Sequence, residues 1–120
     1  MENQDCIFCK VIKGELPSKK IYEDDNFIAI LDTTPIAEGH TLLIPKKHFR
    51  NLLDLPSTMG TELLDAIKKV SLDLIKEYKA DGINVGVNNE ESAGQVVFHT
   101  HVHLLPRKKG DGIKIMQKNE

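Results

Sequence analysis

Apolar residues recur every three or four positions in the middle of the chain, and this spacing predicts one long helix. The positions are Leu63, Ile67, Val70, Leu74 and Tyr78. Residues three or four apart share one side of an α-helix, so these side chains form a stripe that can pack on a core. Ser57 is the expected N-cap, and Gly82 is expected to end the helix.

Short apolar segments on both sides of that helix predict β-strands. The turn-forming residues 24–26 separate the first two segments. From residue 83 to residue 87 apolar and polar residues alternate, which is typical of a strand with one buried face. The strands expected before the helix are Lys20–Glu23, Phe27–Leu31 and Thr41–Pro45.

The elements together predict the fold class. Residues 6–12 are rich in apolar side chains and are followed by Gly14, which indicates a short N-terminal helix. Short strands around a single long helix favour an α+β domain. We therefore expect an antiparallel β-sheet with one long helix on one face and a short helix at the N-terminus.

The most informative pattern lies in residues 98–105, where His99, His101 and His103 occupy alternate positions. Successive side chains of a β-strand point to opposite faces, so a strand here places all three imidazoles on one face. The preceding strand is close in sequence, so we expect the two to pair as an antiparallel hairpin. Asn84 and Asn88 then lie on the histidine side.

Three imidazoles on one face allow three interpretations. Neighbouring histidines are roughly 7 Å apart at Cα and can share a zinc ion, whereas His99 and His103, about 13 Å apart, cannot do so without straining the strand. Alternatively, a neutral imidazole attacks an electrophile while its neighbours bind the developing charge. The histidines can also be purely structural, which strict alternation disfavours.

Length and charge restrict the class of protein. A chain of 120 residues is expected to form one domain, residues 1–120. A net charge of −2 gives no reason to expect binding to nucleic acid or to a membrane, and no apolar segment approaches the length of a membrane span. The polar N-terminus is unlike a signal peptide and there are only two cysteines, so we expect a cytoplasmic protein without disulfides.

The histidine strand resembles the signature of the histidine triad (HIT) superfamily. Other motifs match that family along nearly the whole chain, namely Cys6-Ile7-Phe8-Cys9, residues 39–48, residues 93–98 and Pro106-Arg107. The resemblance is strongest to small Hint-like purine nucleoside phosphoramidases and bacterial HIT proteins, and it implies a single HIT domain that forms a homodimer. Thr100 replaces a usual hydrophobic residue, a change that a β-strand tolerates.

The resemblance implies covalent catalysis by the middle histidine. His101 would attack the α-phosphorus of a nucleotide, form a nucleotidyl-histidine and expel an amine or phosphate, and water would then hydrolyse the intermediate. His103 would bind a phosphate oxygen, His40 would brace the site, and His99 completes the catalytic set. The remaining residues expected to hold the phosphate are Asn88, Gly94 and Gln95.

The resemblance also implies where the nucleoside binds. Asp32 matches the residue that accepts hydrogen bonds from the ribose hydroxyls, and the alternative is a turn residue before Pro35. An apolar pocket for the base is implied at four positions that can also be plain core, Ile7, Phe8, Val11 and Ile30.

Cys6 and Cys9 have the spacing of a zinc-binding pair, a spacing that redox-active or unrelated thiols would share. The resemblance implies that His48 and His99 complete a Cys₂His₂ site. Four protein ligands leave no open position, so zinc there would be structural, and no catalytic cofactor is implied. The competing hypothesis is a hydrolytic zinc ion on His99 and His101.

Two functions of different classes follow. The first is a hydrolase or transferase that cleaves the α-phosphate bond of a purine nucleotide, either a phosphoramidate or a dinucleoside polyphosphate, with AMP or GMP as the bound moiety. The second is a nucleotide-binding regulatory module with little catalysis. Val96 stands where Hint-type enzymes carry a serine that contacts the leaving group, so the sequence leaves the leaving group open.

Overall fold

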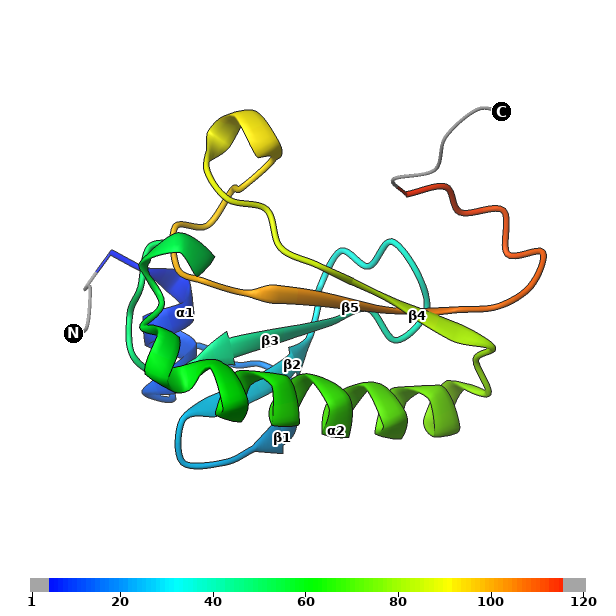
Figure 1. Ribbon diagram of the computed structural model, residues 1–120, viewed down its shortest axis with the longest axis horizontal. Coiled ribbons are helices and arrows are strands. Elements are labelled where there is room, and N and C mark those ends of the chain that lie inside the picture. The colour runs from blue at the N-terminus through cyan, green and yellow to red at the C-terminus, as the bar shows by residue number, and fades with distance from the viewer. Residues whose placement is uncertain (1–4, 116–120) are drawn as a thin grey trace.

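The computed structural model describes residues 5–115, and Figure 1 shows their path. Residues 1–4, which contribute to the argument against a signal peptide, lie outside this range. None of the helices in the described range is both long and apolar enough to cross a membrane. In chain order the elements are α1 (Ile7–Ile12), β1 (Lys20–Glu23), β2 (Phe27–Leu31), β3 (Thr41–Pro45), the 3₁₀ turns η1 (Leu52–Asp54) and η2 (Ser57–Met59), α2 (Gly60–Tyr78), β4 (Gly82–Gly86), the 3₁₀ turn η3 (Glu91–Ala93) and β5 (Val102–Arg107).

The strands form one antiparallel sheet in the order β1-β2-β3-β5-β4. β5 comes last in the chain but lies between β3 and β4 (Figure 1). Hydrogen bonds from both neighbours hold its backbone, so the histidine at its start has a fixed position. The predicted α+β fold, with an antiparallel sheet, one long helix and a short N-terminal helix, is confirmed.

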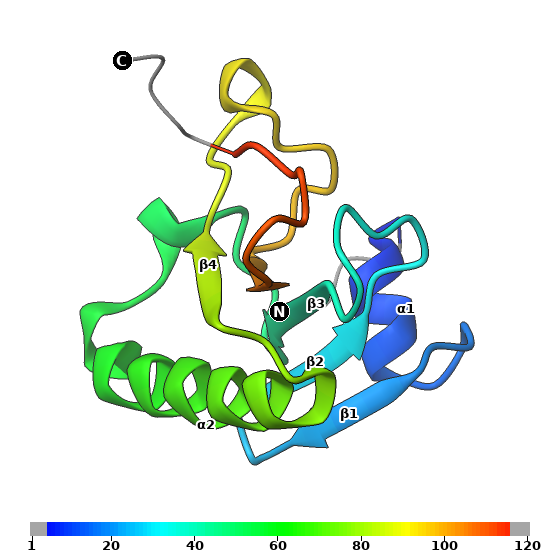
Figure 2. The ribbon, with the colours of Figure 1, turned by 90° about the vertical axis from the view of Figure 1, so that its right-hand side faces the viewer.

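The two helices cover opposite faces of the sheet, as Figure 2 shows. Alternate residues of a strand point to opposite faces, so β2 sends Phe27 and Ala29 to the α2 side and Ile28 and Ile30 to the α1 side. With a helix on each face, four of the five residues of β2 are buried. The sheet therefore has two cores, and the histidine side of β5 faces the α1 core.

Both predicted ends of the long helix are wrong. Ser57 begins a 3₁₀ turn, and α2 starts at Gly60 without a side-chain cap. The helix ends at Tyr78 because Lys79 takes a left-handed conformation (φ 52°, ψ 47°) and its N–H bonds the carbonyl of Ile75. Gly82 already belongs to β4, paired with β5.

The predicted histidine strand is also too long at its start, because β5 begins at Val102 and not at residue 98. The chain bends over residues 97–99. Just after this bend the N–H of Thr100 donates to the carbonyl of Phe49 at 2.7 Å, outside the pairing of β5 with β3. That pairing ends where Val102 meets Leu43.

The predicted hairpin of the last two strands is confirmed. β4 pairs with β5 so that Asn84 faces Leu105 and Gly86 faces His103. Residues paired across an antiparallel ladder share one face, so Asn84 lies on the His103 side, where it accepts a hydrogen bond from Arg107 at 2.6 Å.

Candidate active site

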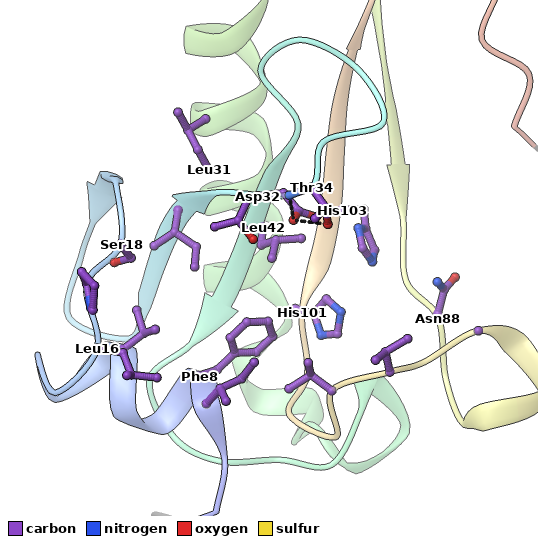
Figure 3. Close-up of a pocket in the computed structure, with 18 residues that line it drawn as sticks. Phe8, Leu16, Ser18, Leu31, Asp32, Thr34, Leu42, Asn88, His101 and His103 are labelled. Atoms are coloured by element: carbon purple, nitrogen blue, oxygen red, sulfur yellow. Dashed lines mark hydrogen bonds between the residues drawn. The ribbon is translucent and has the colours of Figure 1, made fainter.

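A cavity of about 550 Å³ opens on the α1 side of the sheet (Figure 3). This volume is within the range of small-molecule binding sites. Its walls come from α1, the segment that leads into β1, the end of β2 and the chain on both sides of the 3₁₀ turn η3. The lining includes two of the triad histidines, His101 and His103.

His101 is almost completely buried and has a defined tautomer. Its Nδ1–H donates to the backbone carbonyl of His99 at 2.8 Å. Burial lowers its pKa, so the ring is neutral near pH 7. In a neutral imidazole with a proton on Nδ1, Nε2 carries a lone pair, which is what a nucleophile needs. The ring of Phe8 packs edge-on against His101, with centroids 5.1 Å apart.

A chain of hydrogen bonds also sets the tautomer of His103. The N–H of Ile36 donates to Nδ1 of His40 at 3.1 Å, so the proton of the neutral His40 ring is on Nε2. That nitrogen lies 2.9 Å from Nδ1 of His103 and donates to it. The remaining proton of His103 is then on Nε2, available as a donor to a ligand. Burial lowers the pKa of both histidines, that of His103 to about 4.

Asp32, His40 and His103 also bring three potential metal-binding atoms within 4.8 Å of one another. The tautomers count against a metal there. Nε2 of His40 would have to lose its proton while Nδ1 still accepts from Ile36, which would require an imidazolate. The hydrogen bond between the two histidines explains their proximity without an ion.

Two of the residues expected to hold a phosphate line the cavity together with His103, and one does not. Asn88 and Gly94 face it from opposite ends of a loop. Gly94 has φ 93°, a left-handed conformation that favours glycine, and a side chain there would touch Asn88. The side chain of Gln95 lies elsewhere: it is buried and bonds the loop backbone at Glu90 and Val97 and the carbonyl of Arg50 after β3.

All the residues expected to bind the nucleoside line the cavity, namely Ile7, Phe8, Val11, Ile30 and Asp32. Asp32 also closes a turn, since its Oδ1 accepts from the N–H of Thr34 at 3.0 Å. The two interpretations of Asp32 are compatible, because Oδ2 takes no part in this turn. Sequence reasoning missed Leu16 and Ser18, which precede β1 in a stretch without periodicity, as well as Thr34 and Leu42.

The predicted zinc ligands Cys6, Cys9, His48 and His99 converge in the structure. Cys6 is the N-cap of α1, which brings its sulfur close to that of Cys9 one helical turn later. Nδ1 of His99 lies 3.3 Å from the sulfur of Cys6 and 3.5 Å from that of Cys9. Nδ1 of His48 lies 3.4 Å from the sulfur of Cys9 and 3.1 Å from Nδ1 of His99.

These distances fit the edges of a tetrahedral zinc site. Zn–S bonds of about 2.3 Å and Zn–N bonds of about 2.0–2.1 Å separate sulfur from nitrogen by roughly 3.5 Å and two nitrogens by roughly 3.3 Å. Nε2–H of His99 donates to the carbonyl of Pro45 at 2.8 Å, which leaves the lone pair on Nδ1 for the metal. His101 belongs to neither of the candidate metal clusters in residues 5–115, which disfavours a hydrolytic zinc on His99 and His101.

Comparison with known proteins places the chain in a family. The HIT domain family matches residues 13–110. This chain belongs to the HIT family. Adenylylsulfatase HINT3 of Arabidopsis thaliana is 45% identical to it over 107 residues, which are 89% of this chain and 54% of that protein, so the chain spans about half the length of HINT3. Adenosine 5′-monophosphoramidase HNT1 of Candida albicans is 44% identical over 107 residues, 86% of this chain and 70% of that protein.

A solved structure of the same family carries a metal. The zinc-bound histidine triad family protein from Mycobacterium smegmatis matches this HIT protein with a TM-score of 0.87 and 36% identity, over 97% of this chain and 84% of that one. The Cys6, Cys9, His48 and His99 cluster has the donor set and spacing that suit such an ion.

Proposed function

We propose that this HIT protein is a nucleotide hydrolase or nucleotidyl transferase that works through a nucleotidyl-histidine at His101. The observation that carries the proposal is the buried, neutral His101 ring, with Nδ1–H on the His99 carbonyl, in a cavity of nucleotide size. That hydrogen bond leaves the lone pair on Nε2 as the nucleophile.

The reaction has two displacement steps. Nε2 of His101 forms a bond to the α-phosphorus, and the bond from phosphorus to the leaving group breaks with its electron pair on the leaving group. The histidine ring then carries a positive charge, which the carbonyl of His99 stabilises through Nδ1–H. An amine leaving group takes up a proton from solvent as it departs. Water then attacks the phosphorus and loses a proton to solvent, and the N–P bond breaks with its electron pair on Nε2, which returns a neutral ring.

Neighbouring groups supply donors where negative charge builds up on the phosphate. Nε2–H of His103, the side-chain amide of Asn88 and the backbone around Gly94 all border the cavity. The apolar wall around Phe8 suits a purine base. Oδ2 of Asp32 lies 3.5 Å from Nε2 of His40 and has a further lone pair that suits a ribose hydroxyl. The ligand that fits these features is a purine nucleotide such as AMP or GMP.

The names of two relatives support an adenylyl substrate and disagree on the leaving group. One is an adenylylsulfatase and the other an adenosine 5′-monophosphoramidase. Both names describe an adenosine monophosphate group joined to a different leaving group. Val96, whose side chain is 84% exposed at the edge of the cavity, offers no hydrogen bond to either one. We therefore assign the reaction class and leave the choice between amine, sulfate and phosphate to experiment.

We also propose a structural role for zinc. Cys6, Cys9, His48 and His99 would hold the ion, which when bound ties α1 to the backbone that precedes β5. Four protein ligands fill the tetrahedral coordination of zinc, so the ion has no open position for a substrate. A homodimer and a cytoplasmic location remain further predictions from the family resemblance and the composition.

Hydrolysis of adenosine 5′-phosphoramidate by wild type and His101→Ala tests the nucleophile. We expect His101→Ala to lose roughly 1,000-fold or more in turnover and still bind AMP, because the rest of the cavity is intact. Asn84→Ala is the matched control, since Asn84 lies on the same sheet face outside the cavity. Wild-type protein quenched in alkaline denaturant should carry the mass of one adenylyl group (AMP less one water), absent in His101→Ala.

Other outcomes would decide against the proposal. Equal turnover by wild type and His101→Ala would exclude His101 as the nucleophile. Tight AMP binding by a wild-type protein that turns over neither adenylyl sulfate, adenosine 5′-phosphoramidate nor diadenosine polyphosphates would instead support the regulatory module.

A further inference from the structure

The loop that carries the expected phosphate contacts has little regular structure of its own. Asn88 lies before the 3₁₀ turn η3, and Gly94, Val96 and Val97 follow it, all at the wall of the cavity. Between β4 and β5 this short 3₁₀ turn is the only regular secondary structure. Something other than secondary structure must therefore set the position of Asn88 and Gly94 relative to His101.

Glu90, inside this loop, has a backbone conformation that is almost confined to glycine. Its φ is 77° and its ψ is 162°. A side chain in this region is strained, and such strain persists only where the surrounding contacts impose it. Among the described non-glycine residues only Lys79 shares a positive φ, in the milder left-handed helical region at a helix end.

The contacts that impose this conformation come from the segment after β3. Arg50 donates two parallel hydrogen bonds to the Glu90 carboxylate, at 2.7 and 2.8 Å. Asn51, which is 2% exposed, donates a third at 2.6 Å. A bidentate arginine with an additional amide donor fixes both the place and the orientation of a carboxylate.

The backbone of Glu90 is held as well, by Gln95 at the other end of the loop. The N–H of Glu90 donates to the side-chain oxygen of Gln95 at 2.7 Å, and the carbonyl of Glu90 accepts from the N–H of Gln95 at 3.1 Å. The amide of Gln95 donates in turn to the carbonyl of Arg50 at 2.7 Å. Glu90, Gln95 and the Arg50–Asn51 segment thus form a closed network.

We propose that Glu90 is a positioning residue for the reaction: the Arg50–Asn51 segment and Gln95 hold its strained backbone and so set Asn88 and Gly94 against the phosphate bound beside His101. This role rests on the proposed function, since it assigns to that reaction the geometry of the loop. Glu90 itself does not line the cavity, so its proposed effect on the reaction is exerted through the loop.

Two substitutions at Glu90 distinguish the effect of the carboxylate from the effect of the strained backbone. Glu90→Ala removes the carboxylate and keeps a side chain at the strained φ. Glu90→Gly removes the carboxylate but allows the conformation without strain. Glu23→Ala is the control, because Glu23 is also a surface carboxylate held by two basic side chains, Lys20 and Lys46, yet lies outside this cavity.

The expected results are specific to positioning. For Glu90→Ala, kcat with adenosine 5′-phosphoramidate should fall roughly 10- to 100-fold, while KM should change less than about threefold, because misplaced phosphate contacts affect the transition state most. Amides of residues 88–97 should exchange hydrogen roughly 10-fold faster. Glu90→Gly should lie between Glu90→Ala and wild type in both measurements, and Glu23→Ala should match wild type.

Opposite results would overturn the role. A kcat within about twofold of wild type in folded Glu90→Ala, or unchanged exchange over residues 88–97, would show that the network does not position the loop. A Glu90→Gly variant no better than Glu90→Ala would remove the strained backbone from the explanation. If wild type turns over no adenylyl substrate, the proposed function fails on its own, and hydrogen exchange with AMP titration still tests Glu90.

Discussion

The carbonyl of His99 accepts a hydrogen bond from Nδ1 of His101 at 2.8 Å, while the side chain of His99 points the other way, to Cys6 and Cys9. His99 therefore connects the cluster of candidate zinc ligands (Cys6, Cys9, His48 and His99) to the proposed nucleophile, His101. The cluster can influence the reaction through this backbone and through Phe8, which lies between Cys6 and Cys9 and packs against His101. None of its ligand atoms lines the cavity that contains His101.

Removal of the zinc ion proposed for this cluster is expected to lower stability before it affects turnover. A strong chelator should reduce the Tm of the purified protein by about 10 °C or more, equivalent to roughly 2 kcal/mol for a domain of this size. In His48→Ala the chelator should have little further effect, since one ligand is already missing. Scanning calorimetry with and without added zinc measures both. Loss of turnover at an unchanged Tm would instead support a hydrolytic metal.

Asp32→Asn should weaken binding of ribonucleotides and spare that of deoxyribonucleotides. Asparagine keeps the oxygen that accepts from Thr34, so the turn survives, but it lacks the charged oxygen proposed for the ribose. We expect a rise in Kd of roughly 10-fold for AMP and a much smaller one for 2′-deoxy-AMP, as for loss of a hydrogen bond to a charged group. Equal losses for both nucleotides would refute the ribose contact.

Stability should decrease as the pH falls below about 6.5, in part through His103. Burial and then the neighbouring His101 and His40 lower its pKa in the folded state to about 4, whereas Asp32 opposes this shift. The unfolded chain binds a proton near pH 6.5. Between these values the unfolded state holds more protons, so stability is present above pH 6.5 and is lost as the pH falls towards 4.

Urea unfolding at pH 7.0 and 5.0 measures this loss, with chelator present so that metal release does not contribute. His103→Asn keeps an acceptor for His40 and removes the titrating group. The variant should lose less stability between the two pH values than wild type. An identical pH dependence in the two proteins would mean that His103 does not titrate as described.

The sequence pattern predicted the periodic parts of the fold well and their ends poorly. Alternation correctly assigned the faces of β4 and β5, because the face of a residue depends on its own strand alone. The start of β5 depends on a residue distant in sequence, Phe49, whose carbonyl accepts a hydrogen bond from the N–H of Thr100. The end of α2 depends on Lys79 taking a conformation that residue type does not predict.

For the candidate site, motif resemblance predicted which residues converge better than how their side chains point. The two cysteines, His48 and His99 meet as expected. Gln95, expected to face a phosphate, turns instead into the loop and bonds Glu90. Glu90 itself carries no signal in the sequence, since a charged residue in a glycine-like conformation is recognised only from its dihedral angles.

Among the glycines of residues 5–115, Gly39 is the one where an added methyl group should do most harm to the fold. It has φ 84°, and a Cβ there would lie 2.6 Å from two ring carbons of Tyr78, the last residue of α2. Gly39→Ala combines backbone strain with a clash against a partly buried ring, so we expect it to destabilise the protein by about 3 kcal/mol. Urea denaturation measures the change in the free energy of unfolding.

Gly60→Ala provides the matched control. Gly60 has an ordinary helical φ of −60°, and a Cβ there would meet nothing within 4 Å. The same added methyl should therefore be neutral or stabilise by up to about 1 kcal/mol, because alanine loses less entropy on folding. Measured against Tyr78→Ala alone, the double variant Gly39→Ala/Tyr78→Ala should lose less free energy of unfolding, because the clash with the ring is absent. The loss that remains reports the backbone strain at the positive φ of residue 39. A Gly39→Ala variant as stable as Gly60→Ala would contradict the close approach of α2 to the segment before β3.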